Sequence, residues 1–367
     1  MDARERLLTA IHNQAPDRLP CQVHSWMQYY LDTYLDGVDQ YDAYARFPGM
    51  DWVIYVGPRF EYDEADRARW VRTTTDLGTD ASGNQSWRET IETPGGTLST
   101  TRARNAFTTW TTEHLIQSEA DFELWETHVP LPQRIDWTPV TKAKERIGEK
   151  GIVRGGFFGF GQGSPWQDFC TMIGTQEAIM ATFDCPEWVH HVLGTLLRNK
   201  LAVIERAGSF ELDLVETGGG AGSSTVISPA LYREFCLPYD RQQHDALHAA
   251  GTKVVYHLCG GVMHMLDLVA ENHADGMETM TPPSMGGDCD LAESNRCVGD
   301  KLFFIGGFDQ NAGFEKGTPE VAARLVRECH AACPDGGYIC SPSDHFFFGD
   351  PENLRAFAEE ATRCSYE

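Results

Sequence analysis

From about residue 150 onward, short apolar runs alternate with longer stretches of helical hydrophobic period. The apolar runs predict strands at 151–158, 212–219, 253–260, 275–280, 301–308 and 337–343. The stretches between and after them predict helices, near 262–272, 290–298, 317–330 and 351–363. Strands that alternate with helices of this length indicate a parallel sheet.

Two earlier apolar runs, at 19–25 and 51–57, bring the number of predicted strands to eight. Eight strands alternating with helices are typical of a (β/α)8 barrel, the TIM barrel, and 367 residues lie within its size range. A doubly wound open sheet is the alternative, but the segment 21–26 contains no glycine and lacks its fingerprint. We therefore expect one (β/α)8-barrel domain over 1–367.

The interval 60–115 follows a different pattern. Its runs alternate polar and apolar positions, are rich in threonine and are separated by glycine-containing turns. This pattern predicts an antiparallel β excursion. In a barrel, such an insertion would lie over the strand ends and shape a pocket there.

Composition and charge restrict the classes of function. The chain carries 30 basic and 54 acidic residues, a formal charge of −24, which disfavours nucleic acids, anionic membranes and substrates with many carboxylates. No apolar run approaches the roughly 20 residues of a membrane span, and the N-terminus lacks a secretory apolar region. We expect a cytoplasmic protein whose 11 scattered cysteines are reduced.

The densest chemical signal is His257-Leu258-Cys259, followed by two glycines. Side chains two residues apart on a strand point to the same face, so His257 and Cys259 would share one side of the strand end. Barrel enzymes carry their active sites at these carboxyl ends. Nitrogen and sulfur ligands suit Zn²⁺. The alternative is a buried histidine and a small apolar cysteine with no ligand.

Further metal ligands are expected from neighbouring strand ends. Glu278 lies near the end of the next strand, and Asp344 and His345 follow the last one, with Cys340 four residues earlier than Asp344. We favour Asp344 or His345 over Cys340, because Cys340 lies within the strand. A turn-capping role is the alternative for Asp344.

Other residues at the predicted rim are candidates for catalysis or substrate binding. Glu216 precedes a glycine-rich loop, and Asp309 follows a strand end from which it could bond a substrate or orient His257. Together with Glu278 they are the catalytic candidates. The candidates for substrate binding are His24, at the end of the first strand, and Phe158 and Trp166, in the aromatic-rich segment 157–166. That segment fits the wall of a pocket for a planar or apolar group, or a packed loop.

These motifs, in this order, resemble the uroporphyrinogen decarboxylase superfamily. The similarity begins with the helix and turn at 4–20, continues through 227–260 and 305–309, and ends with 336–346 and the closing helix. It covers nearly the whole chain. The resemblance implies a (β/α)8 barrel. The superfamily also contains zinc- and corrinoid-linked methyltransferases, namely methylcobamide:coenzyme M methyltransferases and O-demethylase components.

Within that superfamily, the resemblance favours the methyltransferase branch. The decarboxylase proper has an arginine-rich stretch after its first strand, whereas this chain has no Arg or Lys between Arg18 and Arg46. The zinc ligands of the methyltransferases are an H-x-C pair, matched by His257 and Cys259, and a later Cys. That later position falls here on Asp344 or His345. The resemblance thus implies a harder, mixed site that is less suited to a thiol acceptor.

The expected reaction moves a methyl group from a small O- or N-methylated compound to the cobalt of a corrinoid. Zinc, or an acid such as Glu278 or Glu216, would stabilise the departing atom. The chain has no D-x-H-x-x-G segment, so the cobalamin is expected on a separate corrinoid protein. The alternatives are a metal-independent decarboxylase or lyase that uses His257 and Asp309 as acid and base, and a binding protein without catalysis. The oligomeric state is left open, with a homodimer as one alternative.

Overall fold

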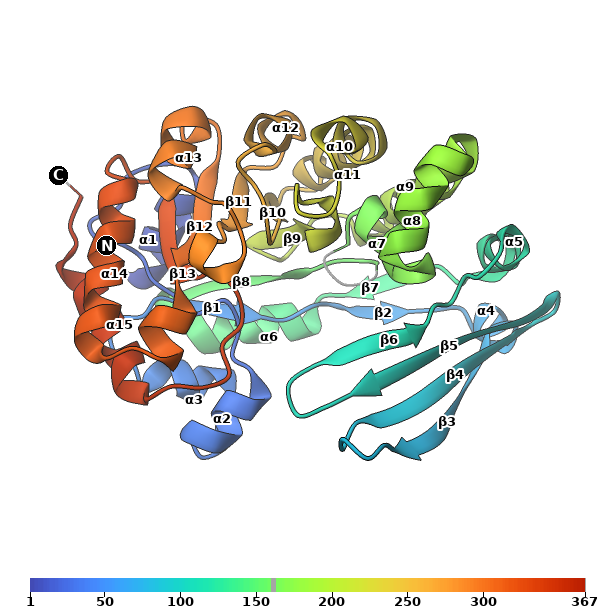
Figure 1. The fold of residues 1–367 in the computed structure, drawn as a ribbon, viewed down its shortest axis with the longest axis horizontal. Coiled ribbons are helices and arrows are strands. Elements are labelled where there is room, and N and C mark those ends of the chain that lie inside the picture. The colour runs from blue at the N-terminus through green and yellow to red at the C-terminus, as the bar shows by residue number, and fades with distance from the viewer. Residues whose placement is uncertain (160–162, 367) are drawn as a thin grey trace.

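The computed structural model describes residues 1–159 and 163–366. Its centre is a sheet of seven parallel strands in the order β1-β8-β9-β10-β11-β12-β13 (Figure 1). These strands are β1 Trp52–Tyr55, β8 Gly151–Gly156, β9 Leu214–Gly218, β10 Lys253–His257, β11 Gly276–Thr279, β12 Phe303–Phe308 and β13 Tyr338–Pro342. Seven of the eight predicted strands are thereby confirmed, together with their parallel pairing.

The eighth predicted strand, at 19–25, is wrong as a regular strand. Only Cys21 forms a parallel bridge, to Cys340. Around it, Cys340 N donates to Pro20 O (2.9 Å), Gln22 N to Cys340 O (3.0 Å) and Asp51 N to Cys21 O (2.8 Å). Pro20 has no N–H to donate, which limits the length of any ladder here. A short extended segment thus joins the two edge strands of a TIM-barrel-like sheet.

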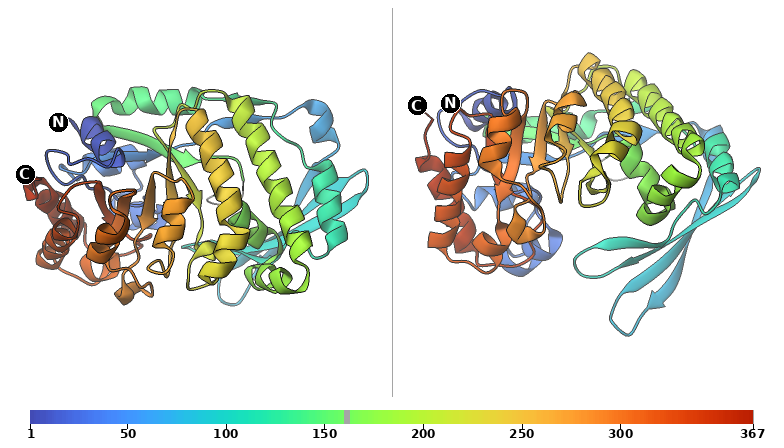
Figure 2. Two further views of the ribbon diagram at one scale, coloured as in Figure 1. Left: turned by 90° about the horizontal axis from the view of Figure 1, so that it is seen from above. Right: turned by 45° about the horizontal axis from the view of Figure 1, so that its top comes forward.

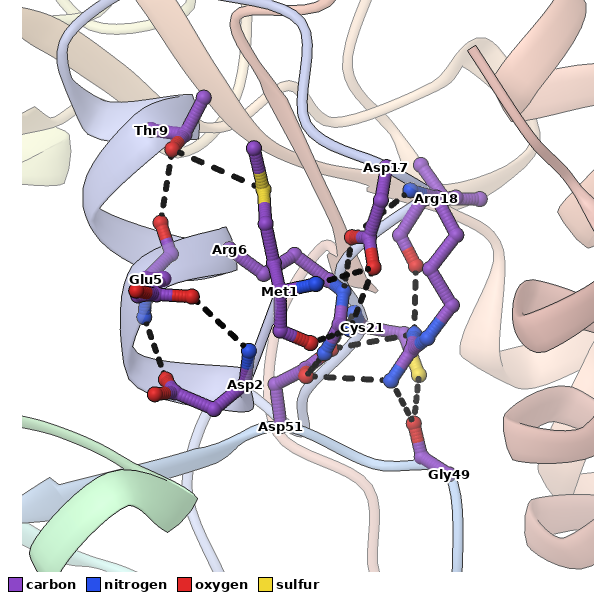
Figure 3. A network of polar contacts seen from close by, with 11 residues as sticks. Met1, Asp2, Glu5, Arg6, Thr9, Asp17, Arg18, Cys21, Gly49 and Asp51 are labelled. Atoms are coloured by element: carbon purple, nitrogen blue, oxygen red, sulfur yellow. Dashed lines mark hydrogen bonds and ion pairs between the residues drawn. The ribbon is translucent and has the colours of Figure 1, made fainter.

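This closing segment is held by the buried carboxylate of Asp51, immediately before β1 (Figure 3). Asp51 Oδ1 lies 2.7 Å from Arg6 Nη1 and 3.1 Å from Arg18 Nη2, and Oδ2 accepts from the backbone N–H of Cys21 at 3.0 Å. Two guanidinium groups and one amide therefore satisfy a fully buried charge, as such burial requires.

Helices surround the sheet and cover its outer face (Figures 1 and 2). The helices before the third sheet strand are α1 Ala3–Ile11, α2 Gln28–Tyr34, α3 Gln40–Ala45, α4 Glu64–Ala68, α5 Glu119–His128, α6 Thr138–Ile147, α7 Pro165–Ile173, α8 Thr175–Asp184 and α9 Pro186–Ala207. The later ones are α10 Pro229–Phe235, α11 Leu237–Ala249, α12 Leu266–Glu271, α13 Leu291–Val298, α14 Pro319–Ala332 and α15 Pro351–Arg363. The predicted helices near 290–298, 317–330 and 351–363 are confirmed, and the one near 262–272 is shorter than predicted.

Two separate hydrophobic clusters follow from the alternation of side chains along each strand. The outer cluster packs the helices against residues such as Val153, Val254 and Phe304. The inner cluster contains Leu7, Ala10 and Ile11 of α1, packed against residues from strands of the sheet, among them Val53, Ile152, Leu214 and Val255. Helix α1 therefore seals the amino end of the curled sheet, and the carboxyl end is left for polar residues.

The predicted antiparallel excursion is confirmed as a four-stranded sheet. It consists of β3 Val71–Thr79, β4 Gln85–Thr93, β5 Gly96–Arg104 and β6 Thr109–Glu113, and is preceded by β2 Arg59–Glu61, which pairs with β7 Arg134–Asp136. This sheet stands out from the curled sheet, and the β5–β6 turn reaches back toward α2 (Figures 1 and 2). The Phe107 ring in that turn contacts Tyr29, Phe347 and Phe348, at centroid distances of 4.7, 5.2 and 5.6 Å.

The structure has all 11 cysteines as free thiols. Among the described residues, no helix is both long enough and apolar enough to cross a bilayer.

Candidate functional site

A polar layer lies directly above the inner hydrophobic cluster, one alternation step nearer the carboxyl ends of the strands. Val53, Ile152, Leu214 and Val255 belong to the cluster. Two residues further along each strand stand Tyr55, Arg154, Glu216 and His257, and Glu278 occupies the matching position on β11. Because residues two apart on a strand face the same side, the layer of side chains above the apolar one consists of titratable groups.

Arg154 is at the centre of this layer and is fully buried. Its Nη2 lies 2.7 Å from Glu216 Oε2 and 2.8 Å from each oxygen of Glu278. Its guanidinium lies 4.6 Å from the centre of the Tyr55 ring, and the Tyr55 hydroxyl donates to Glu216 Oε2 at 3.0 Å. One cation thus joins two carboxylates from different strands.

His257 stands beside Glu278 because the two residues are register partners on β10 and β11. Its Nδ1 lies 3.0 Å from Glu278 Oε1 and 3.6 Å from Glu216 Oε1. Burial disfavours the charged imidazolium, but hydrogen bonds with Cys259 and Glu278 and the two nearby carboxylates raise the pKa of His257 well above its usual range. With Nδ1 bonded to Glu278, Nε2 is the ring nitrogen that a metal could bind, in exchange for the proton it carries.

Glu278 is fully buried, and burial alone would raise its pKa. The charge of Arg154 and the hydrogen bond with His257 outweigh burial and hold the pKa of Glu278 below its usual range. Glu278 is therefore an ionised acceptor, which disfavours the role of proton donor considered for it from the sequence.

Metal-ligating side chains gather in two overlapping groups, each with ligand atoms within 4.8 Å of one another. One group is His24, His257 and Glu278, and the other is His24, Asp344 and His345. The His24 ring lies 5.5 Å from the His257 ring and 5.0 Å from the His345 ring, between centroids. His24, predicted to bind substrate, is thus common to both groups.

Cys259 lies beyond β10, which ends at His257, so the strand itself does not fix its direction. Its thiol nevertheless contacts His257, where it contributes to the raised pKa. It also packs against the glycine-rich loop after β9, because a Cβ on Gly220 would lie 2.6 Å from Cys259 Sγ. Among the described residues, Cys259 belongs to neither of the two ligand groups.

The backbone beside the site adopts an uncommon conformation. Thr279 and Met280, which follow Glu278 directly, have φ angles of +81° and +47°. Positive φ is costly for a β-branched residue and persists where surrounding contacts impose it. The Thr279 hydroxyl donates to Leu258 O at 3.0 Å and so ties the strained turn to the loop that carries Cys259.

Three predicted site residues make their described contacts outside the polar layer around Arg154. Asp309 accepts hydrogen bonds from Ser284 Oγ (2.6 Å) and Ala312 N (2.8 Å), which accounts for both carboxylate oxygens. Trp166 is 1% exposed and donates to Ala221 O, so it supports the glycine-rich loop from within the core. Phe158 lines a cavity beside the antiparallel sheet. Of the segment 157–166, residues 160–162 lie outside the described residues.

Cys340, considered as an alternative ligand, faces away from the site. It belongs to the outer hydrophobic cluster and hydrogen-bonds with Cys329 of α14. Alternation along β13 therefore separates it from Asp344 and His345, which follow the end of the strand.

Arg154 and Tyr55 were not predicted from the sequence as site residues. A signal for Arg154 exists, since it is the only charged residue in the apolar run 151–158. A buried cation in such a run requires a partner from a neighbouring strand. Tyr55 gives no comparable signal, because tyrosine is common in strands.

Comparison with known proteins now identifies the family. A profile of the uroporphyrinogen decarboxylase (URO-D) family matches residues 110–364, more than half of the chain. The chain belongs to this family, as its sequence motifs predict.

Individual relatives match over shorter stretches. The uroporphyrinogen decarboxylase of a Xanthomonas oryzae pv. oryzae strain is 32% identical over 223 residues, covering 55% of this chain and 59% of that protein. That of Xanthomonas euvesicatoria pv. vesicatoria is 37% identical over 121 residues, covering 29% of this chain and 33% of that protein. The chain thus matches from one third to about three fifths of the length of these relatives.

A solved methyltransferase from Methanosarcina mazei has a similar fold. The two structures superpose with a TM-score of 0.66 over 99% of each chain, at 12% sequence identity. At this identity the similarity concerns the fold alone.

Proposed function

We propose that this protein is a metal-assisted methyltransferase, which moves a methyl group from a small O- or N-methylated compound to the cobalt of a separate corrinoid protein. The observation that carries the proposal is the convergence of His24, His257 and Glu278, with ligand atoms within 4.8 Å, at the carboxyl ends of the strands. The thiol of Cys259 lies against the same histidine.

The donor set fits zinc. Imidazole nitrogen, thiolate sulfur and carboxylate oxygen are the ligand atoms that Zn²⁺ takes in proteins. We assign His257, through Nε2, and Cys259 as ligands, and His24, which belongs to the same group as His257, as a third donor. Asp344 and His345 reach the site from its outer side, through the group that they form with His24.

Glu278 is then an orienting residue. It holds His257 Nδ1 at 3.0 Å, and carboxylates in this position commonly fix the ring of a metal-binding histidine. When bound, zinc would supply a Lewis acid for the donor's oxygen or nitrogen. Arg154 and Tyr55 in turn hold the two carboxylates in place.

In the proposed reaction, the bond between the methyl carbon and the donor's oxygen or nitrogen breaks. Its electron pair leaves with the oxygen or nitrogen, which then takes up one proton. Co(I) of the corrinoid supplies the electron pair of the new carbon–cobalt bond. This displacement needs donor, methyl and cobalt nearly in line, so the corrinoid protein must approach the face of the molecule where the strand ends lie.

The alternative is a decarboxylase or lyase, and the names of the curated relatives favour it. A substrate with several carboxylates needs several cations to hold it. Within the described part of the polar layer, the one guanidinium is that of Arg154, whose Nη2 is already bound to Glu216 and Glu278. This arrangement supports methyl transfer over the decarboxylation of such a substrate.

The test combines protein purified without chelator, a Co(I) corrinoid protein encoded by a neighbouring gene, and a panel of methoxylated and N-methylated compounds. We expect the absorption spectrum of methyl-cobalt to develop with at least one donor. The proposal fails if no donor produces it while the protein alone releases CO₂ from a carboxylated substrate.

The antiparallel sheet is proposed to cover the site and to select the donor, as an insertion over a rigid barrel can. We expect Phe107→Ala, which removes the ring that contacts Tyr29, Phe347 and Phe348, to change donor preference. The ring is 37% exposed, so stability should fall by no more than about 1 kcal/mol. Rates with the donor panel and urea unfolding measure the two effects. Trp110→Ala, at 36% exposure, is the matched control, and global unfolding of the Phe107 variant would show that the segment is core.

The contact between Gly220 and Cys259 provides a test of the assigned thiol ligand. A methyl group at Gly220 would lie 2.6 Å from Cys259 Sγ, so Gly220→Ala must displace the thiol. We expect zinc affinity to fall about tenfold, the scale of disturbed support around a metal site. Gly222→Ala is the control, because its Cβ would meet no atom closer than 3.4 Å. Chelator competition measures both, and equal zinc affinities would contradict the assignment of Cys259.

A further inference from the structure

A cavity of about 490 Å³ lies between the antiparallel sheet and helices α5 and α9, and its lining includes Phe158 and Gly159, which follow the end of β8. Its walls include Trp70, Ile91, Leu115, Trp125 and Leu196. The volume is in the range of sites for small organic molecules, which are mostly apolar with a few placed polar groups. None of its described lining residues belongs to the polar layer around Arg154 or to either group of metal-ligating residues.

Two arginines stand at the outer end of the cavity. Arg67, on α4, is exposed, and its guanidinium makes no hydrogen bond or ion pair with the residues that the structure describes. Arg72 is 58% exposed, and its ion pair with Glu89 is long, at 3.7 Å. Burial raises the pKa of the nearby Tyr62 while the charges of Arg72 and Arg67 oppose the rise, so both cations face the same region. In a chain of net charge −24, this is a local positive opening.

The inner end is formed by a buried ion pair. Lys200 Nζ lies 2.5 Å from Asp168 Oδ2, both side chains are 2% exposed, and Nζ also donates to Phe158 O at 2.8 Å. A Cβ on Gly159 would lie 2.2 Å from Lys200 Nζ, so the backbone also closes in on the pair. Because the buried ion pair closes its inner end, the cavity suits a small molecule rather than a protein segment.

We propose that this cavity binds a small planar monocarboxylate, with its apolar body against Trp70 and Trp125 and its carboxylate at Arg67 and Arg72. Aromatic walls favour a flat apolar group, and guanidinium groups favour a carboxylate. The described lining shares no residue with the proposed zinc ligands, and occupancy of the cavity requires neither zinc nor a corrinoid protein.

Isothermal titration of the full chain with benzoate tests the proposal, with benzamide as the uncharged probe of the same shape. We expect benzoate to bind about tenfold more tightly than benzamide, the scale of a charge-assisted contact. The double variant Arg67→Gln/Arg72→Gln should remove this preference and leave benzamide binding unchanged. Arg69→Gln is the matched control, because Arg69 is on the same turn of chain but pairs with Asp66 at 2.7 Å and does not line the cavity.

Three results would overturn the proposal. They are no heat of binding with either probe, equal affinity for benzoate and benzamide, and a benzoate affinity that the double variant leaves unchanged. Circular dichroism of each variant confirms that the comparison is made on folded protein. Loss of methyl transfer in any of these proteins has no bearing on the result, so this proposal and the proposed function fail independently.

Discussion

Separate replacement of His257 and Cys259 by alanine is expected to abolish metal binding while the protein stays folded. In wild-type protein we expect about one Zn²⁺ per chain, held by both side chains. Both residues lie above the inner hydrophobic cluster rather than in it. Each variant should therefore lose its zinc and at least about 100-fold in methyl transfer, since even supporting residues around a metal can be worth this much. Elemental analysis and the methyl-cobalt assay measure the two losses.

Cys297→Ala is the control for Cys259→Ala, because Cys297 is an exposed thiol on α13. It should keep zinc and full activity. Full activity in metal-free wild-type protein would contradict the metal-assisted reaction. If both the His257 and Cys259 variants retain zinc, the metal site must instead be assigned to the other group, formed by His24, Asp344 and His345.

Arg154→Met is expected to cost about 3–5 kcal/mol of unfolding free energy, because among the described residues it leaves two buried carboxylates with His257 alone to balance them. Arg154 Nη2 lies within 2.8 Å of Glu216 and Glu278, and no other guanidinium or ammonium in the described structure pairs with these two carboxylates. Methionine fills part of the same space without charge, so the loss reports mainly on electrostatics. Urea unfolding at neutral pH measures it.

Two further variants separate charge from packing in that experiment. Arg154→Met combined with Glu278→Gln removes one of the stranded charges and should regain part of the lost stability. Arg146→Met replaces an exposed arginine, 51% exposed and paired with Asp39, and should cost no more than about 1 kcal/mol. If Arg154→Met lowers the unfolding free energy no more than Arg146→Met does, the ion pairs of Arg154 do not stabilise the polar layer.

The fold was readable from the sequence wherever an apolar run formed a whole strand. The strands β8 to β13 lie within the predicted runs, because these runs are bounded by glycine, proline or polar residues. The run 19–25 was also predicted as a strand, but it pairs through so few residues that it forms no ladder. Its conformation is set by Cys340 and Asp51, which are distant in the sequence.

The candidate site was predictable only in part, for a similar reason. His257, Glu278 and Glu216 could be placed at strand ends from their own neighbourhoods. Asp309 looked equivalent to them, but its hydrogen bond to Ser284 comes from a loop 25 residues away. The role of Arg154 could not be predicted, because the carboxylates that it pairs with lie 62 and 124 residues further along the chain. Such partners emerge only when the strands are in register.

The way the sheet is closed has a consequence for the order in which the chain is made. Residues 18–22 bond with Asp51 early, but their other partners are Cys340, Cys364 and Ser365. At synthesis rates of about 5–20 residues per second, roughly 20–70 s separate the first segment from these partners. Through that interval residues 18–22 keep unpaired the side that later bonds with Cys340 of β13, an open edge of the kind that invites contact with other chains. Closure of the ring is thus a late event in biosynthesis, and the growing chain must keep this edge protected until β13 and α15 have emerged.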